Sequence, residues 1–363
     1  MDSLTQFTLG AAVSALCLGK KLGPRKSALL GGILGTVPDL DVFLPFDNPV
    51  DAFVLHRGWT HSFFIHALAT PVVGEILVRS IGALRESRAR VWLTVFLCFT
   101  THAIIDAMTV YGTRIFWPFD PDPVGVGSIF IIDPLYTVPL LIVVIWAFFS
   151  ANWTSRFQSW LVAALIFSTS YMGLSIALQA HVENRAETIF ADAGIDARNV
   201  FAIAGPFNTI VWKVIGQEDD RYHNLYISLF DEDDEQARVY THPTRSDLTA
   251  CLEGNDAFEK LRWFSRGYFG TALQGGKVVI SDLRMGLTPS YVFRFAVAEY
   301  AAGNVRSIPP QAIEGQLTSL SDDLNWLADR FVGQPSVRAA EASGGEPYGT
   351  TETASCVERQ TSG

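Results

Sequence analysis

The sequence is poor in cysteine and lacks the short motifs that mark common enzyme classes. Its 363 residues include 4 cysteines, and none of them forms a CxxC pair. Their spacing therefore signals neither a zinc finger nor a disulfide framework. No GxSxG, HExxH, Walker A or GxGxxG string is present, so the sequence supports none of the chemistries that those strings indicate.

Charge is also scarce, and its balance is acidic. Only 18% of the residues are charged and the formal net charge is −10, which argues against a nucleic-acid partner because phosphate binding needs a basic face. Hydrophobic residues make up 49% of the chain and crowd its first half, too many for an ordinary soluble domain. The stretch 1–6 lacks a basic region and a small-residue cleavage site, so no signal peptide is expected.

Long apolar runs dominate residues 1–180. A bilayer core of about 30 Å needs roughly 20 apolar residues in a helix. Six segments are candidates: 4–18, 27–46, 60–83, 90–111, 129–150 and 158–180. The first is short and could span or re-enter, and the second is broken by Pro38. Small residues in the first two favour close packing of their helices.

Basic residues gather in alternate loops between these segments: Lys20, Lys21, Arg25, Lys26, Arg79, Arg85, Arg88, Arg90 and Arg156. Because basic loops face the cytoplasm, we expect loops 19–26, 84–90 and 151–157 on the inner side. The chain after about residue 181 then lies outside. This pattern predicts a multi-pass protein of the cytoplasmic (inner) membrane.

The second half of the chain has a different residue pattern. Runs rich in β-forming residues occur at 223–231, 236–242, 277–282 and 291–299, and 255–264 looks helical. The fold class we predict is an all-α polytopic membrane bundle of five to six helices in residues 1–180, followed by a small α+β extracytoplasmic domain in 181–333. Residues 334–363 are small and polar, which predicts a disordered tail.

Three fragments place histidines and carboxylates inside or beside the apolar runs: PDLD at 38–41, HRGWTHS at 56–62 and THAIID at 101–106. Such groups are costly at membrane depth and are rarely present without a task. Histidine nitrogen with aspartate oxygen suits zinc, manganese or iron. The predicted topology brings all three fragments to one level near the outer face, which indicates a metal centre there.

Two of these fragments offer carboxylates in patterns with alternative readings. His102 and Asp106 are four residues apart on a helix and share a face. They could act as metal ligands, or they could form a hydrogen-bonded pair that holds two helices together. Asp39 and Asp41 could hold one ion, bridge two, or divide as ligand and base. The alternative for PDLD is a turn that faces water.

The HRGWTHS string carries His56 and His61 on either side of a predicted turn. Arg57 is a natural partner for phosphate or carboxylate, Thr60 could cap the next helix, and Ser62 could orient a ligand or water. The alternative is an interfacial loop anchored by a tryptophan.

Two residues outside the three fragments are further candidates. Arg114, in an outer loop, is a candidate anion contact. Asp133, at the outer start of the fifth segment, could also reach the site.

The three fragments in this order, with the opening MDSLTQFTLGAAV and the extension THAIIDAMTVYGTRIFWPF, resemble the YdjM-type membrane-bound metal-dependent hydrolases. The resemblance covers about residues 1–140 and continues loosely through SDLRMG at 281–286, a form typical of the longer members. The family looks like a distant relative of zinc-dependent phospholipase C and related zinc nucleases. The resemblance implies that the family's polar positions are Asp39, Asp41, His56, His61, His102 and Asp106. Relatives often carry histidine where this chain has Gln6.

These observations predict a metallohydrolase that uses a divalent cation, zinc first and manganese or iron as alternatives. The metal would polarise the substrate and lower the pKa of a bound water. We expect the ligands to be Asp39, His56, His61, His102 and Asp106, with Asp41 as second ligand or general base. Arg57 and Arg114 would steady an anionic group.

The expected partners are the lipid bilayer and a small-molecule or lipid substrate with a phosphoester bond, the bond type being implied by the resemblance alone. The alternative is a non-enzymatic transport, metal-sensing or scaffold protein that uses the same cluster.

Overall fold

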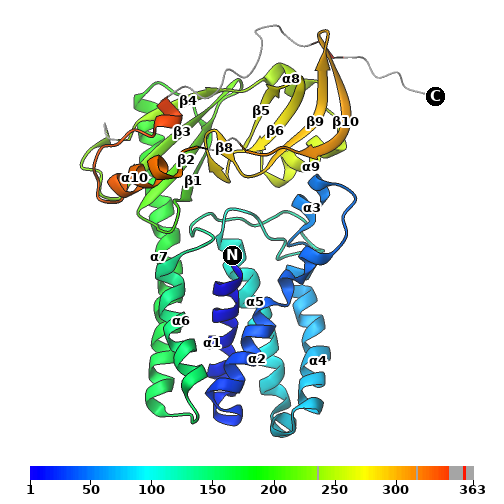
Figure 1. The fold of residues 1–363 in the computed structure, drawn as a ribbon, viewed down its shortest axis with the longest axis vertical. Helices are drawn as coiled ribbons and strands as arrows, with labels where there is room; N and C mark the ends of the chain where they lie inside the picture. The colour runs from blue at the N-terminus through cyan, green and yellow to red at the C-terminus, as the bar shows by residue number, and fades with distance from the viewer. Residues whose placement is uncertain (235–236, 316–317, 343–354, 357–363) are drawn as a thin grey trace, which may run out of the picture. The chain divides into compact units, whose positions relative to one another are not determined.

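The computed structural model describes residues 1–234, 237–315, 318–342 and 355–356 (Figure 1). The chain divides into two compact units. Unit 1 comprises Met1–Leu44, Arg57–Leu178 and Ala204–Thr209; unit 2 comprises Pro45–His56, Gln179–Ile203 and Ile210–Gly363. Unit 2 therefore includes the segment between the PDLD and HRGWTHS fragments. The sequence does not predict this assignment.

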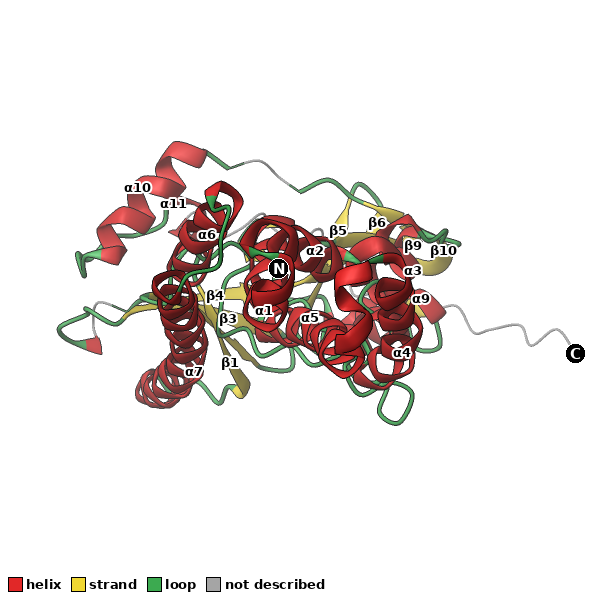
Figure 2. Cartoon of the chain, turned by 90° about the horizontal axis from the view of Figure 1, so that it is seen from below, coloured by secondary structure: helices red, strands yellow, loops and turns green. Residues whose placement is uncertain are grey.

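Unit 1 is helical. Its helices are α1 (Ser3–Leu22), α2 (Pro24–Thr36), the 3-10 helix η1 (Pro38–Phe43), η2 (Trp59–His61), α4 (Phe63–Ser80), η3 (Gly82–Ser87), α5 (Arg88–Met108), α6 (Pro134–Phe149) and most of α7 (Ser155–Asp192). Figure 2 views these helices nearly end-on, and α1 lies among α2, α5 and α6, against which it packs. The apolar core of unit 1 sits on these helices, with Leu9, Val95 and Leu140 among its buried members.

Glycines allow α1 and α2 to approach closely. A Cβ added to Gly10 would lie 2.3 Å from the carbonyl oxygen of Gly31, and one added to Gly35 would lie 2.7 Å from that of Gln6. No side chain fits at these distances, so the backbones touch directly. The predicted close packing of the first two helices is confirmed.

A proline ends the second helix, as predicted. α2 stops at Thr36 and Pro38 begins η1, because proline has no N–H to continue the α-helical hydrogen bonds. Asp39 and Asp41 therefore lie in a tight turn directly after a helix end rather than on a regular helix.

Within the described residues, three helical segments are long and apolar enough to cross a membrane: Phe63–Ser80, Gly82–Met108 and Ser155–Asp192. Pro134–Phe149 is apolar but shorter. The three segments correspond to the third, fourth and sixth predicted spans, and the total of five to six spans stays a prediction.

Unit 2 is rich in β-sheet. Its strands are β1 (Arg198–Ala204), β2 (Val211–Gln217), β3 (Arg221–Ser228), β4 (Val239–Pro243), β5 (Phe269–Gln274), β6 (Lys277–Asp282), β7 (Gly286–Leu287), β8 (Ser290–Tyr291), β9 (Arg294–Ala301), β10 (Asn304–Ala312) and β11 (Ser355–Cys356). They form one sheet in the order β1-β2-β3-β4, another in the order β11-β10-β9-β6-β5, and the small pair β7-β8. The strands predicted from sequence overlap β3, β4, β6 and β9.

Besides the end of α7, the described part of unit 2 contains the helices α3 (Pro49–Leu55), α8 (Ser246–Ala250), α9 (Asp256–Phe264), α10 (Leu320–Phe331) and α11 (Ala339–Ala342). The predicted helix at 255–264 is confirmed by α9. The predicted disordered tail contains α11 and β11, and its residues 343–354 and 357–363 lie outside the described part of the chain.

Helix α3 packs within unit 2 through Phe53. Its ring lies 4.8 Å from that of Phe264 and 4.3 Å from that of Phe293, and Lys260 Nζ lies 2.6 Å from Asp51 Oδ1. The ends of this twelve-residue insertion continue directly into Leu44 and Arg57 of unit 1. A third ring, that of Phe295, lies 5.4 Å from that of Phe53, and this aromatic packing explains why the short insertion joins the second unit.

A disulfide joins Cys251 to Cys356, contrary to the expectation from cysteine spacing. The two residues are 105 positions apart, and local spacing carries no signal for a bridge of that length. Cys17 and Cys98 are free.

Candidate metal centre

Four side chains of unit 1 meet at one point. Asp39 comes from η1, His61 from η2, and His102 and Asp106 from one face of α5. Each offers one nitrogen or oxygen atom, and these atoms all lie within 4.8 Å of one another. Both histidines and Asp106 are buried, while 23% of the Asp39 side chain is exposed. Three elements far apart in sequence thus converge on one buried set of donor atoms.

Five distances between the donor atoms are close to the edges of a tetrahedral metal site. The Nε2 atoms of His61 and His102 lie 3.0 Å apart. Each is 3.4 Å from Asp39 Oδ1, and they are 3.3 and 3.6 Å from Asp106 Oδ2. A tetrahedral zinc site with metal–ligand bonds of about 2.0–2.1 Å has ligand–ligand edges of about 3.3 Å. The spacing therefore fits one small divalent cation.

The backbone of Gly35 sets the tautomer of His102. His102 Nδ1 lies 2.6 Å from the Gly35 carbonyl oxygen, which can only accept a hydrogen bond. The proton of the neutral ring is therefore on Nδ1, and Nε2 presents its lone pair to the cluster.

A short chain of hydrogen bonds through Thr60 and Asp41 also places the His61 proton on Nδ1. Thr60 Oγ1 donates its only proton to Asp41 Oδ2 at 2.8 Å, so it accepts from His61 Nδ1 at 3.0 Å. His61 Nε2 then also presents a lone pair. Two imidazole lone pairs that face each other at 3.0 Å repel unless a cation lies between them, so the chemistry of the donor set fits a metal as well as its spacing does.

The two carboxylates add negative charge to the same point. Asp39 Oδ1 and Asp106 Oδ2 are buried and accept no hydrogen bond from the residues that the structure describes. The other oxygen of Asp106 accepts from Gln6 Nε2 at 2.8 Å and contacts the α-amino group of Met1. One oxygen of Asp106 is thus anchored while the other points at the cluster.

Arg57 forms an ion pair with Asp106. Its Nε lies 3.1 Å from Asp106 Oδ2, its guanidinium lies 4.9 Å from the centre of the Tyr111 ring, and its backbone N–H donates to Asp41 Oδ2 at 2.9 Å. Arg57 has φ of +56°, a left-handed conformation that costs a non-glycine residue about 1–2 kcal/mol. The hydrogen bond to Asp41 helps to hold this backbone in place.

Asp41 organises the site from its edge. Its Oδ2 accepts from both Arg57 N and Thr60 Oγ1, and it is not one of the four clustered residues. This carboxylate ties the turn after α2 to the turn before α4, and through Thr60 it orients His61.

Three further predicted site residues lie at helix ends. His56 is the C-cap residue of α3 and the last residue of the unit 2 insertion. Ser62 caps α4 and its hydroxyl donates to the Trp117 carbonyl. Asp133 caps α6 and accepts from Tyr171 OH at 2.8 Å.

The Arg114 backbone N–H donates to the Arg57 carbonyl oxygen at 3.1 Å, which holds the loop that bears Arg114 beside the site.

Sequence reasoning missed two groups that shape the site. Gln6 appears in the sequence only as a departure from the histidine of its relatives, yet its side chain is the anchor of Asp106. Gly35 appears only as a packing residue, yet its carbonyl fixes His102. A polar residue inside an apolar run was a usable signal for Gln6, whereas a backbone carbonyl leaves none.

These features define a helical membrane protein with a His/Asp group that could bind a metal ion. The model of the YdjM inner membrane protein family matches residues 1–182. This match includes all four clustered residues and covers half of the chain, so the chain belongs to the YdjM inner membrane protein family.

Two curated proteins are similar to part of the chain. The uncharacterized protein YfhP of Bacillus subtilis is 25% identical over 156 residues, which cover 40% of this chain and 46% of that protein. The inner membrane protein YbcI of Escherichia coli is 30% identical over 111 residues, which cover 29% of this chain and 62% of that protein. The chain thus spans about half to three fifths of these relatives. No solved structure matches the chain.

Proposed function

We propose that the chain is a membrane-bound metal-dependent hydrolase that acts on a phosphoester or lipid-related substrate at the outer face of the membrane. The observation that carries this proposal is the meeting of donor atoms from His61, His102, Asp39 and Asp106 within 4.8 Å of one another, with both Nε2 lone pairs turned inward. Zinc is the favoured ion because these ligand types and this geometry suit it, and manganese or iron are the alternatives.

In this proposal, each polar residue has a distinct task. A bound divalent metal supplies Lewis acidity and an activated water, and the four clustered side chains would hold it. Arg57 balances the charge of Asp106 and provides a buried cation beside an anionic substrate group. Asp41 acts as a positioning residue because both hydrogen bonds to its Oδ2 organise the turns that bear Arg57 and His61.

The disulfide supports the proposal that unit 2 lies on the outer side of the membrane. Disulfides form and persist in oxidising compartments such as the periplasm and are rare in the cytosol, and unit 2 holds Cys251–Cys356. An outward unit 2 agrees with the charge pattern of the loops. After mild reduction of intact cells, a membrane-impermeant thiol reagent should label wild-type protein but not Cys251→Ser/Cys356→Ser; equal labelling of both would contradict this orientation.

The deciding experiment measures metal and activity together. Full-length protein purified in detergent should contain about one tightly bound divalent ion per chain by mass spectrometry and should release phosphate or head group from a panel of phosphoesters and phospholipids. His102→Ala should abolish both. His181→Ala is the control because His181 is exposed on α7.

Other outcomes separate the alternatives. Metal without hydrolysis of any substrate in the panel would favour transport or sensing. A folded wild-type protein that takes up no divalent ion would leave the cluster a scaffold and overturn the proposal.

A further inference from the structure

Unit 2 buries a carboxylate in a cradle of three hydrogen-bond donors. Glu341 of α11 is 2% exposed. Its Oε1 accepts from Asn224 Nδ2 at 3.1 Å and from Tyr226 OH at 2.5 Å, and its Oε2 accepts from His242 Nε2 at 2.6 Å. Burial alone would raise the pKa of Glu341, but the His242 and Tyr226 hydrogen bonds and the Lys213 charge lower it below its ordinary value.

Neighbouring strands build this cradle without help from the tail. Asn224 and Tyr226 are two apart on β3 and so share one face of the sheet. His242 pairs with Tyr222 of the same face in the β3–β4 register. Because the antiparallel β3–β4 ladder positions all three donors, the cradle is formed before any carboxylate enters it.

The segment that fills the cradle is held by polar contacts. Its helix α11 has four residues, and Val337, Ala339 and Ala342 are exposed. Arg338 is buried and bonds Asp323 at 2.7 and 3.1 Å. Docking through one arginine and one glutamate resembles the recognition of a peptide more than the packing of a core, since buried ion pairs add little net stability.

Glu341 does not satisfy the cradle completely. Asn224 Oδ1 and His242 Nδ1 are buried and have no hydrogen-bond partner in the described part of the chain. Buried polar atoms are nearly always paired. The two spare atoms give the cradle capacity for a ligand that brings an N–H group beside its carboxylate, as a peptide does.

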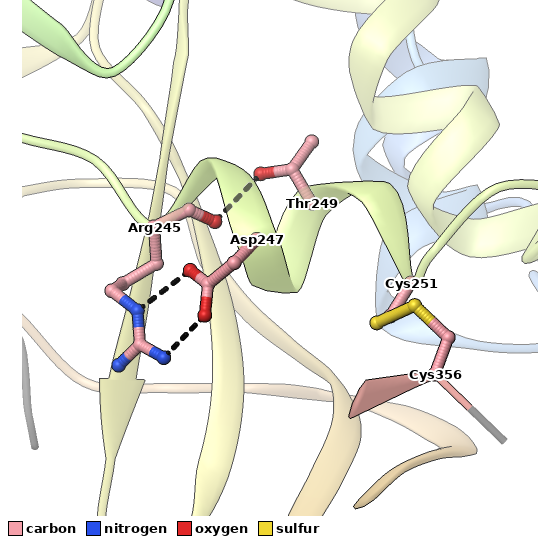
Figure 3. Close-up of a disulfide and its surroundings, with 5 residues drawn as sticks. All are labelled: Arg245, Asp247, Thr249, Cys251 and Cys356. Carbon is pink, nitrogen blue, oxygen red and sulfur yellow. Dashed lines mark hydrogen bonds and ion pairs between the residues drawn. A yellow bond between two sulfur atoms is a disulfide. The ribbon is translucent and has the colours of Figure 1, made fainter. Parts of the chain in front are cut away.

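A disulfide ties the chain covalently beyond this segment. Figure 3 shows the bond between Cys251, which follows α8, and Cys356 of β11. Strand β11 pairs with β10. Cys356 is exposed, so a reductant can reach the bond. Because the bond ties the chain to unit 2 a second time, it raises the effective concentration of Glu341 at the cradle.

We propose that Asn224, Tyr226 and His242 form a carboxylate-binding site for a peptide that presents a glutamate, and that Glu341 occupies this site as an internal ligand which the Cys251–Cys356 disulfide helps to hold in place. The site belongs wholly to unit 2 and is independent of the metal centre. An external peptide competes with the tail, and it gains access when Glu341 is absent or the disulfide is open.

Peptide binding to the full-length protein tests this inference. The probe is a labelled synthetic peptide of residues 335–342, and its control carries Gln in place of Glu341. Glu341→Ala should bind the probe about tenfold or more tightly than wild type with its disulfide intact, and the control peptide should bind about tenfold more weakly than the probe. Asp322→Ala, an exposed acid on α10, should behave as wild type.

A second variant separates displacement from folding. Cys356→Ser keeps Glu341 but removes the tether, so its affinity for the probe should lie between those of wild type and Glu341→Ala. Equal affinity for probe and control peptide, or no binding to folded Glu341→Ala, would refute the site. Unfolding of unit 2 in Glu341→Ala, seen by near-ultraviolet circular dichroism, would also refute it because a displaceable ligand is not needed for folding.

Discussion

The two units each bury histidine beside carboxylate, but the histidine nitrogen that faces the carboxylate carries a proton in unit 2 and a lone pair in unit 1. In unit 2, His242 Nε2 donates to Glu341 at 2.6 Å, so a proton lies between donor and acceptor and the pair is complete. In unit 1, His61 and His102 direct lone pairs at each other at 3.0 Å, and two carboxylate oxygens approach the same point.

The difference lies in what the far nitrogen of each ring contacts. His102 Nδ1 meets a carbonyl, and His61 Nδ1 meets a hydroxyl whose proton is already used. His242 Nδ1 has no hydrogen-bond partner among the described residues, so nothing there forces its proton away from Nε2. Residue type alone thus does not define a metal site, because the groups behind the ligands decide whether lone pairs or protons face inward.

The largest expected effect comes from removing one inward lone pair. His61→Ala should lower the affinity for zinc by more than about 100-fold, since loss of a ligand costs more than loss of its supporting partner. His242→Ala, the matched change in unit 2, should leave zinc affinity unchanged. Competition with a chromophoric chelator measures both, and a similar loss in the two variants would break the comparison.

A smaller effect should follow from the chain of hydrogen bonds behind His61. Thr60→Val removes the hydroxyl that accepts from Nδ1 while it keeps the volume of the side chain, so the tautomer is no longer fixed. We expect zinc affinity to fall by about 10- to 100-fold, with Thr60→Ser restoring most of it. If Thr60→Val bound zinc as wild type does, this chain of hydrogen bonds would not set the tautomer.

A third effect, on stability rather than on metal affinity, concerns protonation in unit 2. Burial lowers the pKa of Lys213 to about 7, and its Nζ donates to the carbonyls of Leu283 and Gly286. The unfolded lysine titrates near 10.4. Between these values the unfolded state binds more protons, so Lys213 makes stability rise with pH, by at most about 1.4 kcal/mol per pH unit.

Lys213→Met should reduce this slope between pH 7 and 10. Denaturant unfolding of unit 2, followed by its tryptophan fluorescence at each pH, compares the slopes of variant and wild type. Identical slopes would mean that Lys213 titrates normally.

Local sequence rules predicted much of the helical unit. Pro38 ended a helix, glycines marked the contact of α1 with α2, and the spacing of His102 and Asp106 placed both on one face. In unit 2 the same rules found β3, β4, β6, β9 and α9 but not β1, β2, β5 and β10. Buried strands such as β2 carry polar residues such as Lys213, which hides their alternation.

The sequence by itself determined which residue types are available to a cation and which helix carries the His102–Asp106 pair. Only the tertiary structure decided that Asp39 and His61 join that pair, that Asp41 stands behind His61, that residues 45–56 belong to the other unit and that Cys251 meets Cys356. The physical reason is that ligand spacing and tautomer depend on partners tens of residues away, such as Gly35 for His102, and on distances that no local pattern encodes.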